Sequence, residues 1–173
     1  QGVILAGMII GRAASIFQGL HATLVQSFGP EARGGACSAQ VVLASDTIHF
    51  PYVGEPDVLV VMSQEASRLF APHVRRGGMI LYEQDLVNTE SFPGEARAFG
   101  VPATRIAEEL RRSMILNIVM VGFFTAVTGS ITRQAASDAV RASVPAGTES
   151  LNMKAFDRGF EYGSSLVAKE GRA

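Results

Sequence analysis

Residues 56–82 read PDVLVVMSQEASRLFAPHVRRGGMILY, and this stretch decides the fold. Val58 to Met62 is a continuous apolar run, which is typical of a strand covered on both faces. Ser63 has the residue type of an N-cap for a helix from Gln64 to about Val74. A glycine pair then ends that helix, and Met79 to Tyr82 forms the next strand. This spacing predicts a βαβ unit, with two parallel strands joined by a right-handed crossover.

The residues before this unit predict one helix followed by strands. Val3 to Gly19 is apolar nearly all round in its first half, which indicates a buried helix. Gly7 and Gly11, four residues apart, leave a smooth face that can pack closely against a sheet. The strands expected outside the βαβ unit are Thr23–Phe28, Ser38–Ala44, Ile48–Phe50, which Pro51 ends, and Ala96–Val101.

The C-terminal half is predicted to be helical. A helix capped by Thr104 carries Ile106, Leu110 and Met114 on one face, and the apolar run Met114–Val127 indicates a buried core helix. The remaining predicted features are Thr132 as the N-cap of Arg133–Ser143, and a last helix from Glu149 with the stripe Met153, Phe156, Phe160, Gly163 and Val167. We therefore predict one domain over residues 1–173. Its class is α/β: a Rossmann-like open sheet, largely parallel, flanked by helices, with a helical C-terminal part.

Composition excludes several classes of protein. The net charge is -1 and there is no basic run, so no footprint for nucleic acid is expected. The longest apolar run is too short for a membrane-spanning helix. With one cysteine, Cys37, the chain forms no internal disulfide and cannot hold a Cys-ligated iron cluster, which fits a reducing, cytoplasmic compartment. Because the chain begins at Gln1 without Met, we expect its N-terminus to be truncated.

The strongest candidate site is the turn Gly29 to Gly35 between two predicted strands. It carries Glu31, Arg33 and the adjacent Gly34 and Gly35. The arginine fork suits carboxylate or phosphate, and glycines let a backbone approach another surface closely. From these residues alone, a structural role for the turn is as well supported as a ligand site.

Other candidate residues favour structural roles. Gln1-Gly2 at a helix start is a weak candidate for an anion cradle, because unpaired N–H groups favour negative charge there. Asn117 within an apolar helix is expected to bond backbone rather than ligand. The three histidines lie far apart and lack metal-ligand spacing, and Cys37 is expected to be a small buried residue. Asn152 indicates local structure, whereas Gly159 and Gly163 indicate either close helix packing or a subunit contact.

Several motifs, in order along the chain, resemble one family. They are Gln1-Gly2 before a glycine-spaced helix, Gly29–Gly35, Ile48-His49-Phe50-Pro51, Pro56–Val61, Asn117 before Gly122, and Leu151–Phe156 with Gly159. Together they resemble the γ subunit of 2-oxoacid:ferredoxin (acceptor) oxidoreductases over nearly the whole chain. The Glu-Ala-Arg-Gly-Gly form of the turn is more similar to the 2-oxoglutarate type than to the pyruvate type.

The resemblance implies a subunit of a complex that oxidatively decarboxylates a 2-oxo acid, with 2-oxoglutarate favoured. In such a complex thiamine diphosphate with magnesium forms the adduct, iron–sulfur clusters pass electrons to ferredoxin, and coenzyme A takes the acyl group. The chain lacks the Gly-Asp-Gly segment expected of a thiamine site, so we expect it to bind none of these cofactors alone and to be inactive in isolation. The resemblance implies α and β partner subunits, and a ferredoxin-like δ subunit in some complexes, with neither nucleic acid nor membrane as a partner.

Within this reading, Gln1, Gly2, Glu31, Arg33, Gly34 and Gly35 border the shared active site on its coenzyme A side. Arg33 would contact phosphate or carboxylate, and Glu31 would orient it. Open α/β sheets collect ligands at the carboxyl ends of their strands, where these residues are expected. Three alternatives stay open: a free-standing Rossmann-like module that binds a nucleotide or other anion, a purely structural subunit, and a family member acting on pyruvate or another 2-oxo acid.

Overall fold

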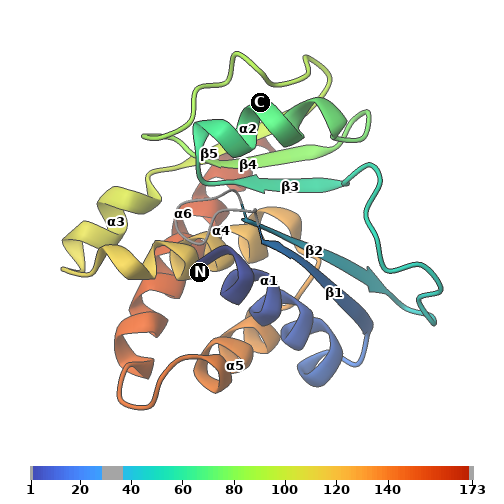
Figure 1. The fold of residues 1–173 in the computed structure, drawn as a ribbon. Coiled ribbons are helices and arrows are strands. Elements are labelled where there is room, and N and C mark those ends of the chain that lie inside the picture. The colour runs from blue at the N-terminus through green and yellow to red at the C-terminus, as the bar shows by residue number, and fades with distance from the viewer. Residues whose placement is uncertain (1, 29–36, 172–173) are drawn as a thin grey trace.

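The computed structural model describes residues 2–28 and 37–171 (Figure 1). The strands are β1 (His21–Phe28), β2 (Cys37–Ala44), β3 (Val58–Val61), β4 (Met79–Glu83) and β5 (Arg97–Val101). The α-helices are α1 (Gly2–Arg12), α2 (Gln64–Phe70), α3 (Ala103–Glu109), α4 (Leu116–Thr128), α5 (Arg133–Ser143) and α6 (Glu149–Glu170). A π-helical turn η1 (Ala13–Phe17) extends α1, and short 3₁₀ turns η2 (Ala71–His73) and η3 (Ser113–Ile115) follow α2 and precede α4.

The predicted βαβ unit is confirmed. β3 and β4 pair in parallel, with Val58 opposite Met79, and β5 adds to the far side of β4, also in parallel. Ser63 caps α2 as expected, because its side chain accepts a hydrogen bond from the N–H of Ala66 at 3.2 Å. The α/β class is thus confirmed, with β4 as the central strand of a three-stranded parallel sheet.

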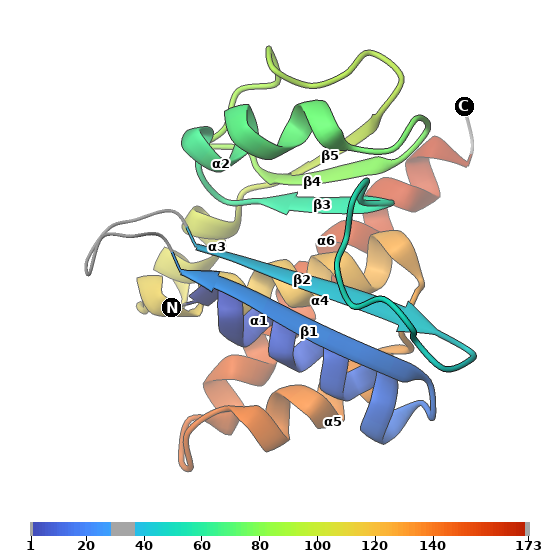
Figure 2. The same cartoon turned by 45° about the vertical axis from the view of Figure 1, so that its right-hand side comes forward.

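The first two strands form a separate antiparallel hairpin. β1 and β2 pair over their full lengths, from His21 opposite Ala44 to Phe28 opposite Cys37. Among the described residues they share no hydrogen-bonded ladder with β3, so the strands divide into two sheets (Figure 2). α1 packs on the hairpin through Gly7, where an added Cβ would lie 2.7 Å from Ala39 Cβ. The smooth glycine face predicted for this helix is confirmed.

The C-terminal helices build most of the core. α4 is buried on nearly every side and crosses α6 at glycines from both helices, Gly122 and Gly159. Gly159 and Gly163 therefore serve close helix packing, one of the two roles considered for them. Thr132 caps α5 through the N–H of Ala135 at 3.2 Å, as predicted. No helix in the described part of the chain is both long and apolar enough to cross a membrane.

The predicted extents of two elements were wrong. The helix expected from Thr104 to Met114 ends at Glu109, and Met114 is 83% exposed. Arg111 takes a left-handed conformation (φ 58°), and the N–H of Arg112 bonds back to the carbonyl of Ala107, which closes the helix in a Schellman motif. The piece Ile48–Phe50 forms no strand and lies instead in the long loop between β2 and β3.

Candidate functional site

Gly2 and Asn117 bring the first turns of α1 and α4 together. The side-chain amide of Asn117 donates a hydrogen bond to the carbonyl oxygen of Gly2 at 3.2 Å, and Asn117 is 4% exposed. An added Cβ at Gly2 would lie 3.2 Å from Asn117 Cβ, so glycine permits the close approach. The predicted backbone bond of Asn117 is confirmed, and it fixes the start of α1 against the core.

The start of α1 lies at the same end of the molecule as the last pair of the β1–β2 hairpin, Phe28 and Cys37. Along this contact Gly11 faces Val41 and Gly7 faces Ala39. Four residues of the helix rise about 6 Å and two residues of the strand about 6.6 Å, so four positions in α1 correspond to two positions in β2. Val3, four residues before Gly7 in α1, therefore lies beside Cys37, two residues before Ala39 in β2. Figure 2 shows the arrowhead of β1 beside the N-terminus, on the side toward which β3 also points.

This arrangement brings one predicted site residue, Gly2, to the edge where the strands β1 and β3 end. Such edges are where ligands of open α/β sheets bind. The other predicted site residues, Gln1, Glu31, Arg33, Gly34 and Gly35, lie outside the described residues. Cys37, which follows that segment, is a free, half-buried thiol opposite Phe28.

A buried carboxylate that belongs to none of the sequence motifs lies at the carboxyl end of β4. Glu83 is fully buried; its Oε1 accepts the N–H of Thr104 at 3.1 Å and its Oε2 accepts the N–H of Asp85 at 2.9 Å. Glu83 thus caps the first turn of α3, the role predicted for Thr104, and that prediction was wrong. The available signal was a carboxylate directly after the apolar residues of a buried strand.

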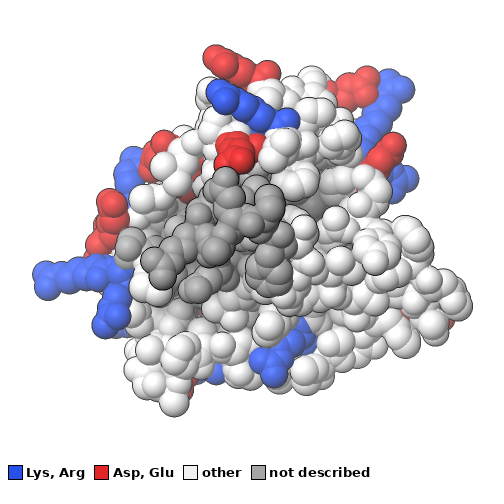
Figure 3. Space-filling model, in the orientation of Figure 1, with Lys and Arg blue, Asp and Glu red and all other residues white. Residues whose placement is uncertain are grey.

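Charged residues gather near α3. Arg105 Nε lies 2.7 Å from Asp85 Oδ2, and this hydrogen bond, followed by the carboxylate's charge, raises the pKa of Arg105. An open groove of about 390 Å³ between α3 and α6 is lined by charges of both signs, among them Arg105, Glu109 and Arg158. Figure 3 shows blue and red side chains together over α3. Gly2, the one predicted site residue that the structure describes, does not line this groove, and the mixed charges of the groove give it no preference for an anion.

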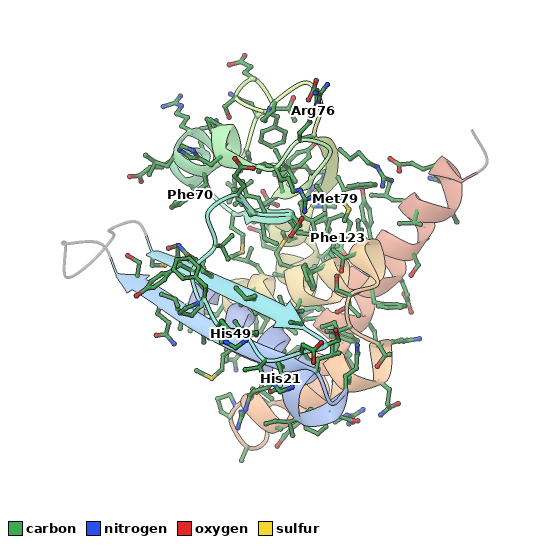
Figure 4. All side chains as sticks on the ribbon, turned by 90° about the vertical axis from the view of Figure 1, so that its right-hand side faces the viewer. His21, His49, Phe70, Arg76, Met79 and Phe123 are labelled. Carbon is green, nitrogen blue, oxygen red and sulfur yellow. The ribbon has the colours of Figure 1, made fainter. Side chains whose placement is uncertain are left out.

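The described residues contain no cluster of three or more His, Cys, Asp or Glu side chains that could hold a metal. His21 begins β1, His49 lies in the loop after β2, and His73 ends the turn η2. Figure 4 shows His21 and His49 on the side of the hairpin, away from the parallel sheet. Asn152 donates to the carbonyl oxygen and the hydroxyl of Thr148 at the start of α6, which is the local role expected of it.

The family model and the similar proteins indicate the same family. Residues 1–162 match the family model for pyruvate ferredoxin/flavodoxin oxidoreductase. The 2-oxoglutarate synthase subunit KorC of Methanocaldococcus jannaschii is 42% identical over 168 residues, which cover 96% of this chain and 90% of the relative.

Two solved structures share the fold. The γ subunit of a keto/oxoacid ferredoxin oxidoreductase from Geobacter sulfurreducens is 36% identical, with a TM-score of 0.82 over 95% of this chain and 92% of that one. A 2-oxoglutarate:ferredoxin oxidoreductase from Magnetococcus marinus, with 2-oxoglutarate, coenzyme A and succinyl-CoA bound, has a TM-score of 0.84 at 22% identity. The match covers 95% of this chain but 29% of that longer chain. The chain belongs to the pyruvate ferredoxin/flavodoxin oxidoreductase family.

Proposed function

We propose that this chain is the γ-type subunit of a 2-oxoglutarate:ferredoxin oxidoreductase. The complex would convert 2-oxoglutarate and coenzyme A to succinyl-CoA and CO₂ while reducing ferredoxin. The name of the 42% identical relative supports this substrate over pyruvate, as does the Glu-Ala-Arg-Gly-Gly turn. Family membership weighs against a free-standing nucleotide-binding module.

The chemistry would be divided among subunits. Thiamine diphosphate with magnesium and the iron–sulfur clusters would be held by other chains, since a single cysteine cannot ligate a cluster. The partners would be α and β subunits, with a ferredoxin-like δ subunit in some complexes, and ferredoxin would accept the electrons. We place the complex in the cytoplasm, because its cluster chemistry and the free thiol of Cys37 suit a reducing compartment.

Within the complex, residues 1–173 would act as one domain that borders the active site without breaking bonds. The observation that carries this role is the convergence of Gly2, held by Asn117, with the end of the β1–β2 hairpin at Phe28 and Cys37. Gln1 and Gly2 would offer backbone N–H groups, and Arg33 would contact a phosphate of coenzyme A. Glu31 would orient Arg33, and Gly34 and Gly35 would permit close approach.

Replacement of Arg33 in the assembled complex tests this role. For Arg33→Ala we expect normal assembly and an unchanged KM for 2-oxoglutarate. The KM for coenzyme A should rise about tenfold, because one charge-assisted hydrogen bond is lost. The matched control is Arg68→Ala in α2, which should change neither constant. An Arg33→Ala complex that assembles and keeps its KM for coenzyme A and its turnover would refute the role. Failed assembly with normal kinetics in the residual complex would instead favour a purely structural turn.

A further inference from the structure

The two strands of the β1–β2 hairpin carry no acidic side chain and, apart from His21, no basic one. Each strand has eight residues, and neither contains Asp, Glu, Lys or Arg. Every described ion pair lies on other elements, for example Asp57 with Arg75 and Arg97 with Glu170. In Figure 3 the lower right of the molecule, where β1 and β2 run toward the loop that follows them, is almost entirely white, whereas coloured side chains surround β3–β5 and α3.

One face of the hairpin is covered by α1, and no helix of the described residues covers the other. Since side chains alternate along a strand, Ala39 and Val41, which face α1, place Gln40 and Val42 on the opposite, outer face. The cross-strand partners of these two residues are Val25 and Thr23, which share that face. None of the four is fully buried.

The loop between β2 and β3 adds an aromatic pair to this surface. Phe50 is 68% exposed and Tyr52 is 57% exposed, although their rings pack against each other with centroids 5.5 Å apart. The loop is fixed to the outer face, because the N–H of Val53 donates to Gln40 Oε1 at 3.0 Å. Two anchored, exposed aromatic rings beside an uncharged face have the composition of a protein interface centre.

The free edge of β1 carries none of the usual protection against pairing. Its eight residues pair with β2 in unbroken register, with no bulge, proline or lysine. Among the described residues its other edge pairs with no strand. Exposed edges of this kind are normally blunted or covered, so an uncharged, regular edge indicates cover by another chain.

We propose that the outer hairpin face, with Phe50 and Tyr52, is the surface that docks on a partner subunit of the same complex. The inference rests on the proposed function and adds the surface through which this chain would join the complex. The occupant is an apolar, uncharged face, because a charged one would lose its hydration here without gaining a partner. In the Magnetococcus marinus structure the same fold is 29% of a longer chain, so there it is continuous with further parts of the enzyme. We assign as the occupant the separate subunit that corresponds to the remaining part of that longer chain.

Single charges placed on this surface test the assignment. The variants are Phe50→Lys and Tyr52→Lys, and the matched control is Leu86→Lys, a comparably exposed apolar residue (52%) in the loop after β4. Each tagged chain is co-expressed with the thiamine-bearing and cluster-bearing subunits, and the complex is quantified by size exclusion. We expect both test variants to lower the yield of complex at least tenfold, whereas the control assembles like the wild type. The circular dichroism of all purified chains should be unchanged.

The outcomes separate this inference from the proposed function. If the wild type assembles and both test variants assemble equally well, the docking surface is refuted and the proposed function stands. If the wild-type chain associates with none of these subunits, the proposed function fails and the inference fails with it. If the wild-type chain alone is a dimer that Phe50→Lys dissociates, while the complex still forms, the occupant is a second copy and our assignment is wrong.

Discussion

The backbone of Gly159 in α6 lies directly against the carbonyl oxygen of Val119 in α4, closer than any Cβ could approach. The contact is reciprocal, because Gly122 of α4 lies equally close to the carbonyl oxygen of Phe156 in α6. Two helices can approach this closely only where neither carries a side chain. This crossing holds the C-terminal helix on the core.

Gly159→Ala and Gly122→Ala are therefore expected to destabilise the chain strongly. Each methyl group would force the two helices apart, and overpacking of this kind costs about 3 kcal/mol of unfolding free energy or more. The control is Gly54→Ala, where an added Cβ meets nothing within 4 Å. Urea denaturation measures all three, and equal midpoints for Gly159→Ala and Gly54→Ala would contradict the close crossing.

Glu83 provides a second test of the fold. In Glu83→Gln one carboxylate oxygen becomes an NH₂ group, so either the N–H of Thr104 or that of Asp85 loses its acceptor. A buried N–H left without a partner costs about 1–3 kcal/mol. We expect thermal unfolding of Glu83→Gln at a lower temperature, whereas Glu90→Gln at an exposed position should match the wild type. A wild-type midpoint for Glu83→Gln would show that the cap contributes nothing.

The exposed pair of Asp85 and Arg105 should contribute much less than Glu83. Both side chains reach solvent, so salt and water weaken their attraction. Because the folded pKa of Arg105 is raised, its contribution is present at lower pH and disappears only as the pH rises through that folded pKa, far above neutrality. We expect Asp85→Asn to lower the free energy of unfolding less than Glu83→Gln does. Because Arg105 stays charged between about pH 6 and pH 9, this loss should be the same throughout that range. The test is denaturation at two salt concentrations, and a loss that grows at high salt would disprove it.

The parts of the fold that could be predicted are those with local signals. Val58–Met62, the N-cap Ser63 and the glycine pair each identify one step of the βαβ unit, and no distant contact is needed to interpret them. The division into two sheets could not be predicted in this way, because no local signal shows whether the hairpin of β1 and β2 continues to β3. Among the described residues it does not. Of the candidate site, Gly2 and Asn117 were both noted, but their contact joins residues 115 positions apart.

Asn117→Ala tests that contact. Loss of its hydrogen bond to Gly2 should cost about 1 kcal/mol and release the first turn of α1. Hydrogen exchange should therefore accelerate in the second turn of α1, whose N–H groups bond to carbonyl groups of the first turn, and leave α6 unchanged. Asn152→Ala is the matched control: it is similarly buried, but its amide bonds Thr148 within its own helix start. Equal exchange in α1 for both variants would show that Asn117 does not hold the helix.

The sequence pattern failed at the end of α3, and that failure also gives a prediction. The apolar spacing of Ile106, Leu110 and Met114 favours a continuous helix, yet Arg111 stands at the left-handed position that glycine normally fills. A residue with a Cβ costs roughly 1 kcal/mol in this conformation. Arg111→Gly should thus raise the unfolding free energy by about 0.5–1 kcal/mol, although glycine is the more flexible residue when unfolded. Arg112→Gly, one residue beyond the left-handed position, is expected to give no gain. Denaturation of both variants decides the matter: a loss of stability in Arg111→Gly would mean that the arginine side chain holds the corner through contacts stronger than the strain it carries.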